Sequence, residues 1–557
     1  MNALYLMVAG LGAFTVGYLV YSRFISERIF QLNPEFRTPA HVQEDGVDFV
    51  PTNRWVLWGH HFTSVAGAAP IVGPAIAVIW GWLPAFLWIT LGTVFFAGIH
   101  DAGALWASVR NEGKSIGALT ESVVGKRARS LFMIIIFLLL LMVNAVFAII
   151  IARLFVQHPT SVIPAWFVIA VAITIGYLLY RRGVALLWPS IIGVTLLYAS
   201  MFVGNEVPLS LPESMFGLGP AGIWVVILFT YAAIASLLPV WLLLQPRDYI
   251  NGLQLFIGLG IFFLAVLIAR PEVVAPMINS SVPDDVPPIF PLLFVTIACG
   301  ACSGFHGLVS SGTTSKQVNN EQDVRFVGFL GTVGEGSLAL AAIIACTAGF
   351  ATLGDWQGYY TSFATNGIDA FVQGGGVILA SIPGISESFG RTLLAVMAIL
   401  FAATTMDTGV RLLRYIVQEW GTIYDIPVLT GKGLSTVLAV GCCLALAFGS
   451  GGGGEGGLII WPLFGTTNQL LAALTLLVLS VFILKQGRPT VYTLAPFSFL
   501  LFMTVWALLT QLRGFYDNEQ YFLLGLDAVI LVTAIWVGLE SLSALRKAAS
   551  ESRESSA

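Results

Sequence analysis

Ionisable side chains are scarce in this sequence, yet several lie inside its most apolar segments. His60 and His61 occur in WGHHFTSVAGAAPIVGP, His100 and Asp101 in GIHDAGALW, and His306 in SGFHGLVSSGTTSKQ. Imidazole changes its charge near physiological pH, and ionisable groups within membrane segments usually face the protein interior. These residues are therefore candidates for a pathway that carries an ion or a polar substrate.

His306 is the strongest candidate for coupling transport to an ion, because it lies among glycine, serine and threonine. A histidine that only hydrogen-bonds to backbone is an equal alternative. Glu335 in GTVGEGS is another ionisable residue in an apolar run. Asp407 and Arg411, in FAATTMDTGVRLLRY, are four residues apart, which favours an ion pair on one helix face; a proton relay through Asp407 is the alternative.

Hydroxyl groups follow His306 at the end of its segment, as Ser310, Ser311 and Thr314. Such oxygens can hold a hard cation together with carbonyl oxygens of an interrupted helix, or can simply hydrogen-bond between helices. Asn468 and Gln469 in WPLFGTTNQLLAAL are interpreted as packing residues. The lone CxxC motif of Cys299 and Cys302 has no second pair to complete it, so no metal site is predicted.

The run GAAPIVGP predicts a break in an apolar helix, because Pro70 and Pro74 each remove a helical hydrogen bond. A kinked but continuous helix is the alternative. In membrane proteins, a break is tolerated where it lines a cavity or is buried in protein. Inverted repeats would place a second break five helices later, at 222–244, where Pro239 falls mid-span and Pro246 near the end.

The composition indicates that membrane-spanning helices position these residues. The 557 residues are 57% hydrophobic and only 10% charged, whereas soluble domains have about 25% charged residues. Helices of about 20 apolar residues span a bilayer. Fifteen segments meet that length: 4–22, 58–80, 83–109, 131–156, 161–180, 184–203, 222–244, 252–269, 289–312, 326–352, 391–413, 434–449, 457–484, 491–511 and 521–544.

Charge predicts the orientation of these helices. All but four of the 26 Lys and Arg residues fall on one side of the predicted membrane, the exceptions being Arg153, Arg270, Arg391 and Arg513. The positive-inside rule then places the N-terminus outside and the C-terminus in the cytoplasm. The long outer loop 353–390 is expected to cap the outer face. The net charge of −4 does not indicate a nucleic-acid partner, and no ATP-binding or cofactor motif is present.

Five motifs, WGHHFTSVAGAAPIVGPAIA, GIHDAGALWASVRNEGKSIG, SGFHGLVSSGTTSKQ, FAATTMDTGVRLLRYIVQE and WPLFGTTNQLLAAL, resemble the carbon starvation protein A family over residues 58–474. The resemblance implies an all-α polytopic inner-membrane transporter of the amino acid–polyamine–organocation superfamily, with a five-plus-five inverted repeat. It implies these parts: an extra helix and loop in 1–57, repeats in 58–203 and 222–413, about four accessory helices in 434–544, and a flexible tail in 545–557.

The same resemblance implies uptake of pyruvate or short peptides, coupled to protons or sodium and without a cofactor. It places a coupling cation at Gly67 or Ala68 with Ser310, Ser311 and Thr314. Proton-coupled relatives can use a lysine on the fifth repeat helix, which has none here. A proton would then use His or Asp, and the candidates are Asp101, His306 and Asp407.

The leading hypothesis is secondary active import of a small carboxylate-bearing nutrient through the lipid bilayer, with no catalytic residues. The substrate carboxylate would lie against backbone N–H groups of the first break. The predicted substrate-binding residues are His61, Ser64, Gly67, Ala68, Ala69, Ile71, Ser236 and His306. A membrane nutrient sensor and a metal-dependent membrane enzyme are the alternatives.

Overall fold

The computed structural model describes residues 1–46, 48–184, 187–215, 217–239, 242–363, 367–449 and 459–554. Among these residues, thirteen helices are long and apolar enough to cross a membrane, or fourteen if one bent pair forms a single span. The predicted span 289–312 is absent from that count because it is divided into two short helices. The chain is therefore a helical, multi-pass membrane protein.

The first half of the chain begins with a peripheral helix and an interrupted span. Its helices are α1 (Ala3–Val16) and α2 (Ser22–Phe24) within the span Ala3–Phe30, α3 (Pro39–Val42), α4 (Arg54–Val65), α5 (Ala69–Ala77), α6 (Trp82–Gly92), α7 (Gly98–Arg110), α8 (Ile116–Val123), α9 (Lys126–Gln157), α10 (Val162–Arg182), α11 (Leu187–Glu206), α12 (Pro220–Leu237) and α13 (Leu244–Ala269).

The second half contains the other interrupted span and two helices at one end of the bundle. Its helices are α14 (Ile289–Thr296), α15 (Gly304–Gly312), α16 (Leu330–Ala348), α17 (Leu353–Tyr359), α18 (Gly367–Leu379), α19 (Glu387–Ile423), α20 (Lys432–Gly449), α22 (Trp461–Lys485), α23 (Val491–Asp517) and α24 (Tyr521–Glu554).

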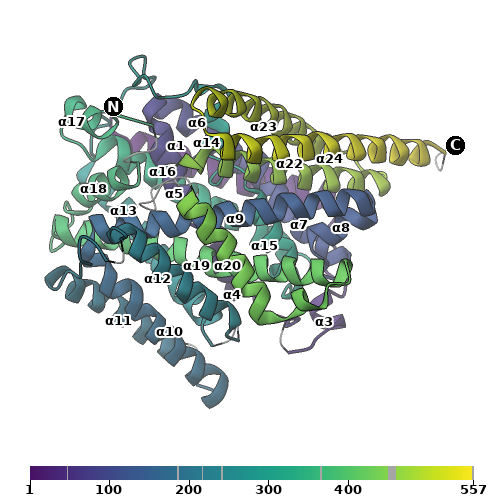
Figure 1. Ribbon diagram of the computed structural model, residues 1–557, viewed down its shortest axis with the longest axis horizontal. Helices are drawn as coiled ribbons and strands as arrows, with labels where there is room; N and C mark the ends of the chain where they lie inside the picture. Colours follow the sequence, from purple (N-terminus) through teal and green to yellow (C-terminus); the bar gives the residue numbers. More distant parts are fainter. Residues whose placement is uncertain are drawn as a thin grey trace.

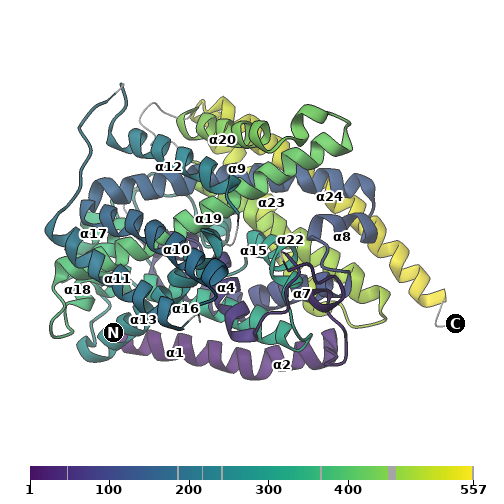
Figure 2. The same ribbon diagram turned by 90° about the horizontal axis from the view of Figure 1, so that it is seen from below.

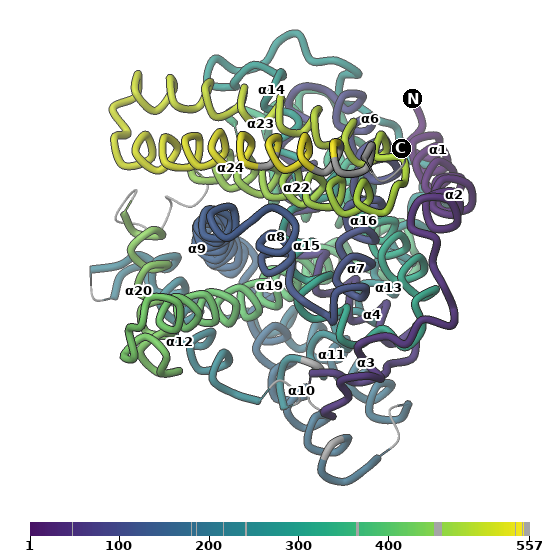
Figure 3. Tube along the Cα trace, turned by 90° about the vertical axis from the view of Figure 1, so that its right-hand side faces the viewer, coloured from purple at the N-terminus to yellow at the C-terminus, as the bar shows by residue number. Residues whose placement is uncertain are grey.

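Many of the long helices run roughly along one axis, so that the bundle has two ends. Figures 1 and 2 show α17 and α18 at the same end as the N-terminus, with α8 and the C-terminus at the opposite end. Figure 3 looks along this axis and shows α9 end-on, with α1 and α2 at the edge. The loop predicted to cap one face therefore contains α17 and α18.

Four spans form the core of the bundle. The most apolar windows of α19 and α22 are 89% buried within the protein, and those of α9 and α16 are 78% buried. The windows of the other spans are at most 50% buried, so these helices present much of their apolar surface outward. Apolar residues lie all around α9. They suit a buried helix as well as one that faces lipid, because lipid and the protein interior are similarly apolar.

The second helix break does not lie where the sequence predicted. Helix α12 is unbroken from Pro220 to Leu237, and residues 240–241 of the predicted segment are outside the described residues. Leu238 is extended, as a residue before proline prefers, so Pro239 follows the end of α12 instead of interrupting it. Pro246 lies in the first turn of α13, where a missing N–H costs no helical hydrogen bond.

The second break lies instead between α14 and α15. The intervening residues 297–303 include the sequence ACGACS, and Gly300 has a φ of +95°. Glycine adopts this left-handed conformation without the steric penalty that a Cβ would bring. A glycine and small residues, rather than a proline, therefore interrupt this span.

Candidate functional site

The predicted interruption of the segment 58–80 is confirmed at residues 66–68, between α4 and α5, whereas Pro74, also predicted to break the helix, lies inside α5. The two half-helices are bent by 49° relative to each other. Asn53 caps the start of α4 through Trp55 N–H, and Pro70 occupies the first turn of α5. The first N–H groups of a helix have no partner within it, so the start of α5 presents amides to this break.

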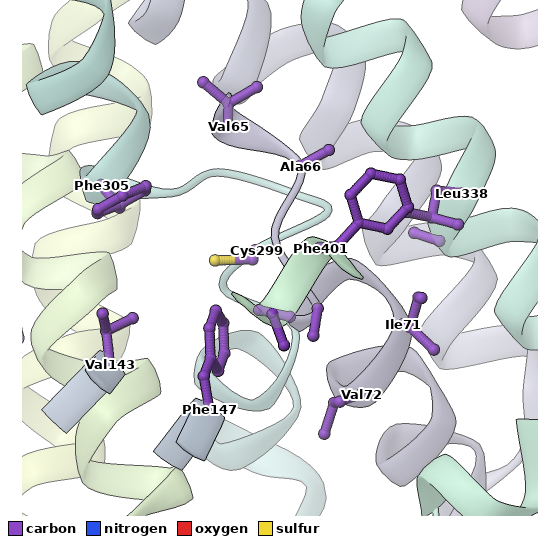
Figure 4. Close-up of a cluster of buried hydrophobic side chains, with 14 of the residues drawn as sticks. Val65, Ala66, Ile71, Val72, Val143, Phe147, Cys299, Phe305, Leu338 and Phe401 are labelled. Atoms are coloured by element: carbon purple, nitrogen blue, oxygen red, sulfur yellow. The ribbon is translucent and has the colours of Figure 1, made fainter. Parts of the chain in front are cut away.

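Close packing against α9 and α19 holds the first break. A Cβ on Gly67 would lie 2.6 Å from Thr405 Oγ1 and 3.1 Å from a ring atom of Phe147. Both distances are shorter than normal carbon contacts, so any larger residue here would force Thr405 or Phe147 to shift. Figure 4 shows Val65 and Ala66 above Ile71 and Val72, with Phe147 and Cys299 beside the break.

The second break is held mainly by polar side chains. Thr93 Oγ1 donates to Gly300 O at 3.0 Å, and Trp88 Nε1 donates to Ile297 O at 3.2 Å. At the start of α15, the Phe305 N–H donates to Asn468 Oδ1 at 3.0 Å. Backbone groups away from water need hydrogen-bond partners. Side chains from α6, from α22 and from the π-helical turn Thr93–Ala97 therefore supply the hydrogen bonds that an unbroken helix would have made here.

The two breaks lie against each other. A Cβ on Gly73 in α5 would lie 2.5 Å from the carbonyl oxygen of Thr296, the last residue of α14. A Cβ on Gly300 would lie 3.6 Å from Pro70 Cα. Segments more than 200 residues apart in the chain thus meet at the centre of the bundle, as Figure 4 also shows for Cys299 and Ala66.

A buried ionisable cluster lies at the second break. Asp101 on α7 contacts two imidazoles, with 2.6 Å from Oδ1 to His100 Nδ1 and 2.9 Å from Oδ2 to His306 Nδ1. His306 Nε2 lies 3.3 Å from Glu335 Oε1 on α16, and the Gly300 N–H donates to that oxygen at 2.9 Å. We call His100, Asp101, His306 and Glu335 the central cluster; its members are at most 1% exposed.

The central cluster unites two residues predicted for coupling with two that the sequence had only noted. Asp101 and His306 are 205 positions apart and were singled out separately. His100 and Glu335 were recognised as buried ionisable residues without a role. Asn468, interpreted from the sequence as a packing residue, also binds the Ser303 hydroxyl through Nδ2 at 3.0 Å.

Two of the three hydroxyl groups predicted for a cation site, those of Ser311 and Thr314, have hydrogen-bond partners. Thr314 Oγ1 lies 3.0 Å from His61 Nδ1 and joins α4 to the turn after α15. Ser311 Oγ donates to Gly307 O at 2.6 Å and accepts the Ile116 N–H at 2.9 Å. Ser310 Oγ is buried without a hydrogen-bond partner among the described residues.

Two predicted substrate residues bind within their own helices. Ser64 Oγ donates to His60 O at 2.8 Å, and Ser236 Oγ donates to Ala233 O at 3.0 Å. Ser236 lies near the end of the unbroken helix α12, away from the two breaks described here. Ala68, Ala69 and Ile71, also predicted to bind the substrate, are buried at the first break.

The predicted ion pair between Asp407 and Arg411 is wrong. Asp407 pairs with Arg247 of α13 and accepts the Tyr231 hydroxyl at 2.9 Å. Arg411 instead donates to two backbone carbonyl oxygens at the end of α12, those of Ala235 at 3.0 Å and Leu238 at 2.8 Å. Helix spacing permitted the local pair, but the unpaired carbonyls of α12 are better partners for Arg411.

Arg247 was not recognised from the sequence as a functional candidate. It is 1% exposed, and it also bonds Thr404 at 3.0 Å and Tyr231 at 2.6 Å. A cavity of about 20 Å³ lies beside Arg247 and Tyr231, which is room for about one water molecule. The only sequence signal was QPRDY, an arginine and an aspartate directly after an apolar run.

Two interrupted helices that meet at a buried ionisable cluster, within a bundle of membrane spans, are typical of polytopic secondary transporters. The profile of the family "Carbon starvation protein CstA" matches residues 2–353 and 350–507. The chain belongs to this family.

Curated relatives agree with that assignment. A Campylobacter jejuni protein named peptide transporter CstA is 32% identical, over 93% of this chain and 82% of its own length. The Bacillus subtilis peptide transporter CstA is 30% identical, over 93% of this chain and 92% of its own. The Escherichia coli pyruvate/proton symporter BtsT is 30% identical, over 93% of this chain and 82% of its own length. The chain is a membrane transporter and not an enzyme.

Solved structures support the same fold. A mutant of the Eremococcus coleocola manganese transporter aligns with a TM-score of 0.55 over 90% of this chain and 99% of its own length. Its sequence is only 14% identical, so this likeness concerns the arrangement of helices alone.

Proposed function

We propose that this chain is a secondary active importer of a small carboxylate-bearing nutrient, pyruvate or a short peptide, driven by a proton or sodium gradient across the plasma membrane. The observation that carries the proposal is the meeting of two interrupted helices at the central cluster. The names of the relatives, peptide transporter and pyruvate/proton symporter, support this substrate class.

We further propose a five-plus-five inverted repeat with boundaries other than 58–203 and 222–413. The first repeat comprises α4 with α5, α6 with α7, α9, α12 and α13. The second comprises α14 with α15, α16, α19, α20 and α22. The hairpin α10–α11 is then an insertion, the span Ala3–Phe30 precedes the repeats and α23 and α24 follow them.

Matching neighbours support this division. Helix α5 packs on α16 of the other repeat, and α15 packs correspondingly on α7. Helix α13 packs on α4 and α19, and its counterpart α22 packs on α15 and α9. Equivalent contacts in both halves are what a pseudo-twofold relation requires.

Substrate binding would use the half-helix N-termini. The amides of Gly67, Ala68 and Ala69, at the first break, carry partial positive charge toward the substrate carboxylate, whereas Pro70 has no N–H and the Ile71 N–H donates to Ala68 O at 3.0 Å. Val65, Phe147 and Phe401 crowd the region in this structure (Figure 4). The carboxylate therefore enters only when the two repeats move relative to each other, as alternating access requires.

The coupling cation would enter the central cluster. Asp101 and Glu335 bring two carboxylates to His306 in a site away from water, and such a site attracts positive charge. A second candidate site for the coupling cation is formed by Gly67, Ala68, Ser310 and Thr314. The Ser310 hydroxyl there is buried and has no hydrogen-bond partner among the described residues. Asp407 is paired with Arg247 and serves better as a structural ion pair.

The proposed orientation places the α17–α18 end outside and the α8 end in the cytoplasm. The N-terminus lies at the first end and the C-terminus at the second, in accord with the distribution of Lys and Arg (Figures 1 and 2).

Proteoliposomes loaded with buffer test the function. Uptake of labelled pyruvate and dialanine is measured with an inward proton gradient, an inward sodium gradient or neither. We expect one gradient to drive accumulation of at least one substrate. His306→Ala abolishes that accumulation, whereas His41→Ala, at an exposed position of the short helix α3, leaves it unchanged. Gradient-independent flux of both substrates contradicts the coupling, and normal uptake by His306→Ala removes the central cluster from it.

A further inference from the structure

Three donor atoms of different kinds meet at the second break. Cys299 Sγ, His306 Nε2 and Glu335 Oε1 all lie within 4.8 Å of one another. Cys299 is in the connection between α14 and α15, His306 is on α15, and Glu335 is on α16. All three side chains are buried. Thiolate, imidazole and carboxylate are the three protein ligand types that Zn²⁺ uses.

His306 directs its second ring nitrogen at this group. Its Nδ1 lies 2.9 Å from Asp101 Oδ2, while Nε2 is buried 3.3 Å from Glu335 Oε1 and forms no hydrogen bond among the described residues. A histidine whose Nδ1–H donates to a carboxylate carries its lone pair on Nε2. Histidine ligands of metals are commonly oriented in this way by a neighbouring carboxylate.

The other two donors also have supporting hydrogen bonds. Asn468 Nδ2 donates to Cys299 Sγ at 3.0 Å, and the Gly300 N–H donates to Glu335 Oε1 at 2.9 Å. Such bonds orient the ligand atoms and stabilise their negative charge. The thiolate and the carboxylate together carry two negative charges, so a divalent cation would leave these ligands neutral, which limits the cost of burial.

We infer that Cys299, His306 and Glu335 form a binding site for a borderline-soft divalent cation of the Zn²⁺ type. A thiolate with an imidazole favours such an ion over Mg²⁺ or Ca²⁺. Tetrahedral ligands at about 2.0–2.3 Å from the ion lie roughly 3.3–3.8 Å apart, so the donor atoms need to approach by about 1 Å. Binding releases the thiol proton, and the fourth position stays open.

This inference goes beyond the proposed transport: it shares His306 and Glu335 with the central cluster, but it is argued from the positions of the three donor atoms and not from any coupled uptake. The lone CxxC motif gave no reason to expect a metal site, because no second pair completes it, and its second cysteine, Cys302, is not one of the three donors. The partners of Cys299 come from positions 7 and 36 residues further along the chain, so no local motif announces them.

Cobalt provides the test, because Co²⁺ replaces Zn²⁺ and its bond to a thiolate gives a near-ultraviolet charge-transfer band. The full-length chain, purified in detergent with a chelator and then freed of it, is titrated with CoCl₂ and afterwards with ZnCl₂. We expect a saturable band at one Co²⁺ per chain, which Zn²⁺ abolishes. Cys302→Ser retains the band as a matched control, and Cys299→Ser lacks it. Asp101→Asn weakens Co²⁺ binding by about 10–100-fold.

Size-exclusion chromatography and circular dichroism of each variant monitor folding. Where Cys299→Ser does not give a folded protein, Glu335→Gln provides the same comparison through loss of affinity. Absence of a saturable band in the wild-type chain overturns the inference, as does an equal band in Cys299→Ser. These spectra are recorded without any gradient or substrate, so their failure is distinguishable from a failure of the transport assay.

Discussion

The buried pair of Arg247 and Asp407 gives the sharpest test of how the core is held together. Both side chains are 1% exposed, and the pair joins α13 to α19. Asp407→Ala removes the only carboxylate bonded to the Arg247 guanidinium among the described residues, leaving it the neutral hydroxyls of Tyr231 and Thr404. A buried charge that loses its partner costs about 3–5 kcal/mol.

The hydrogen bonds that Arg247 keeps after Asp407→Ala narrow the expected loss of folding free energy. Arg247 retains hydrogen bonds to Tyr231 and Thr404, each worth about 1 kcal/mol net, so Asp407→Ala is expected near the lower limit, about 3 kcal/mol. Replacing both charges, as in Arg247→Met with Asp407→Leu, removes the unpaired charge. We expect the double variant to be more stable than Asp407→Ala alone.

Reversible unfolding in mixed detergent micelles, followed by tryptophan fluorescence, measures these free energies. Asp517→Ala is the matched control, because its pair with Arg513 is exposed and such pairs contribute about 0–1 kcal/mol. Double-mutant cycles should give a larger coupling for Asp407 with Arg247 than for Asp407 with Arg411. A loss below about 1 kcal/mol in Asp407→Ala, or equal coupling to both arginines, would refute the reasoning.

Two glycine substitutions test the packing of the interrupted helices. Gly67→Ala places a Cβ 2.6 Å from Thr405 Oγ1 and should destabilise the chain by about 1–3 kcal/mol, measured in the same unfolding assay; adding Thr405→Ala should recover part of that loss. No recovery would mean that the hydroxyl is not the obstacle. Gly465→Ala places a Cβ 2.1 Å from Val295 O, a backbone atom that cannot rotate away, and should lower the yield of folded protein in size-exclusion chromatography. Gly12→Ala, with nothing within 4 Å, is the control for both, and equal behaviour of all three variants would contradict the packing described here.

Much of the fold could be predicted from hydrophobic length, because a bilayer requires long apolar helices whatever their sequence. The first break was also predictable, since Pro70 removes a helical hydrogen bond inside an apolar run. The second was not found because proline was taken as the signal. Pro239 ends a helix, whereas Gly300 and its small neighbours interrupt one without any residue that forbids a helix.

The candidate site was only half predictable for a different reason. His306 and Asp101 are ionisable residues in apolar segments, which is unusual, so each could be identified separately from the sequence as a candidate for ion coupling. Their contact depends on packing between α7 and α15, which no spacing in the sequence encodes. The opposite error arose with Asp407 and Arg411, where helix spacing is informative but a partner from another helix, Arg247, replaces the local one.

The two breaks are held by different forces, and this difference assigns them different chemistry. Pro70 and the close packing of Thr405 and Phe147 around Gly67 maintain the first break, where the polar groups of the chain are backbone amides. The second is maintained by side chains that bond its backbone, among them Asn468 and Glu335. A carboxylate substrate is served by amides without competing anions, whereas a cation is served by the carboxylates and imidazoles of the central cluster. Gly300 of the second break packs on Pro70 of the first, so in the proposed mechanism a cation that shifts the second break would also shift the amides proposed to hold the substrate.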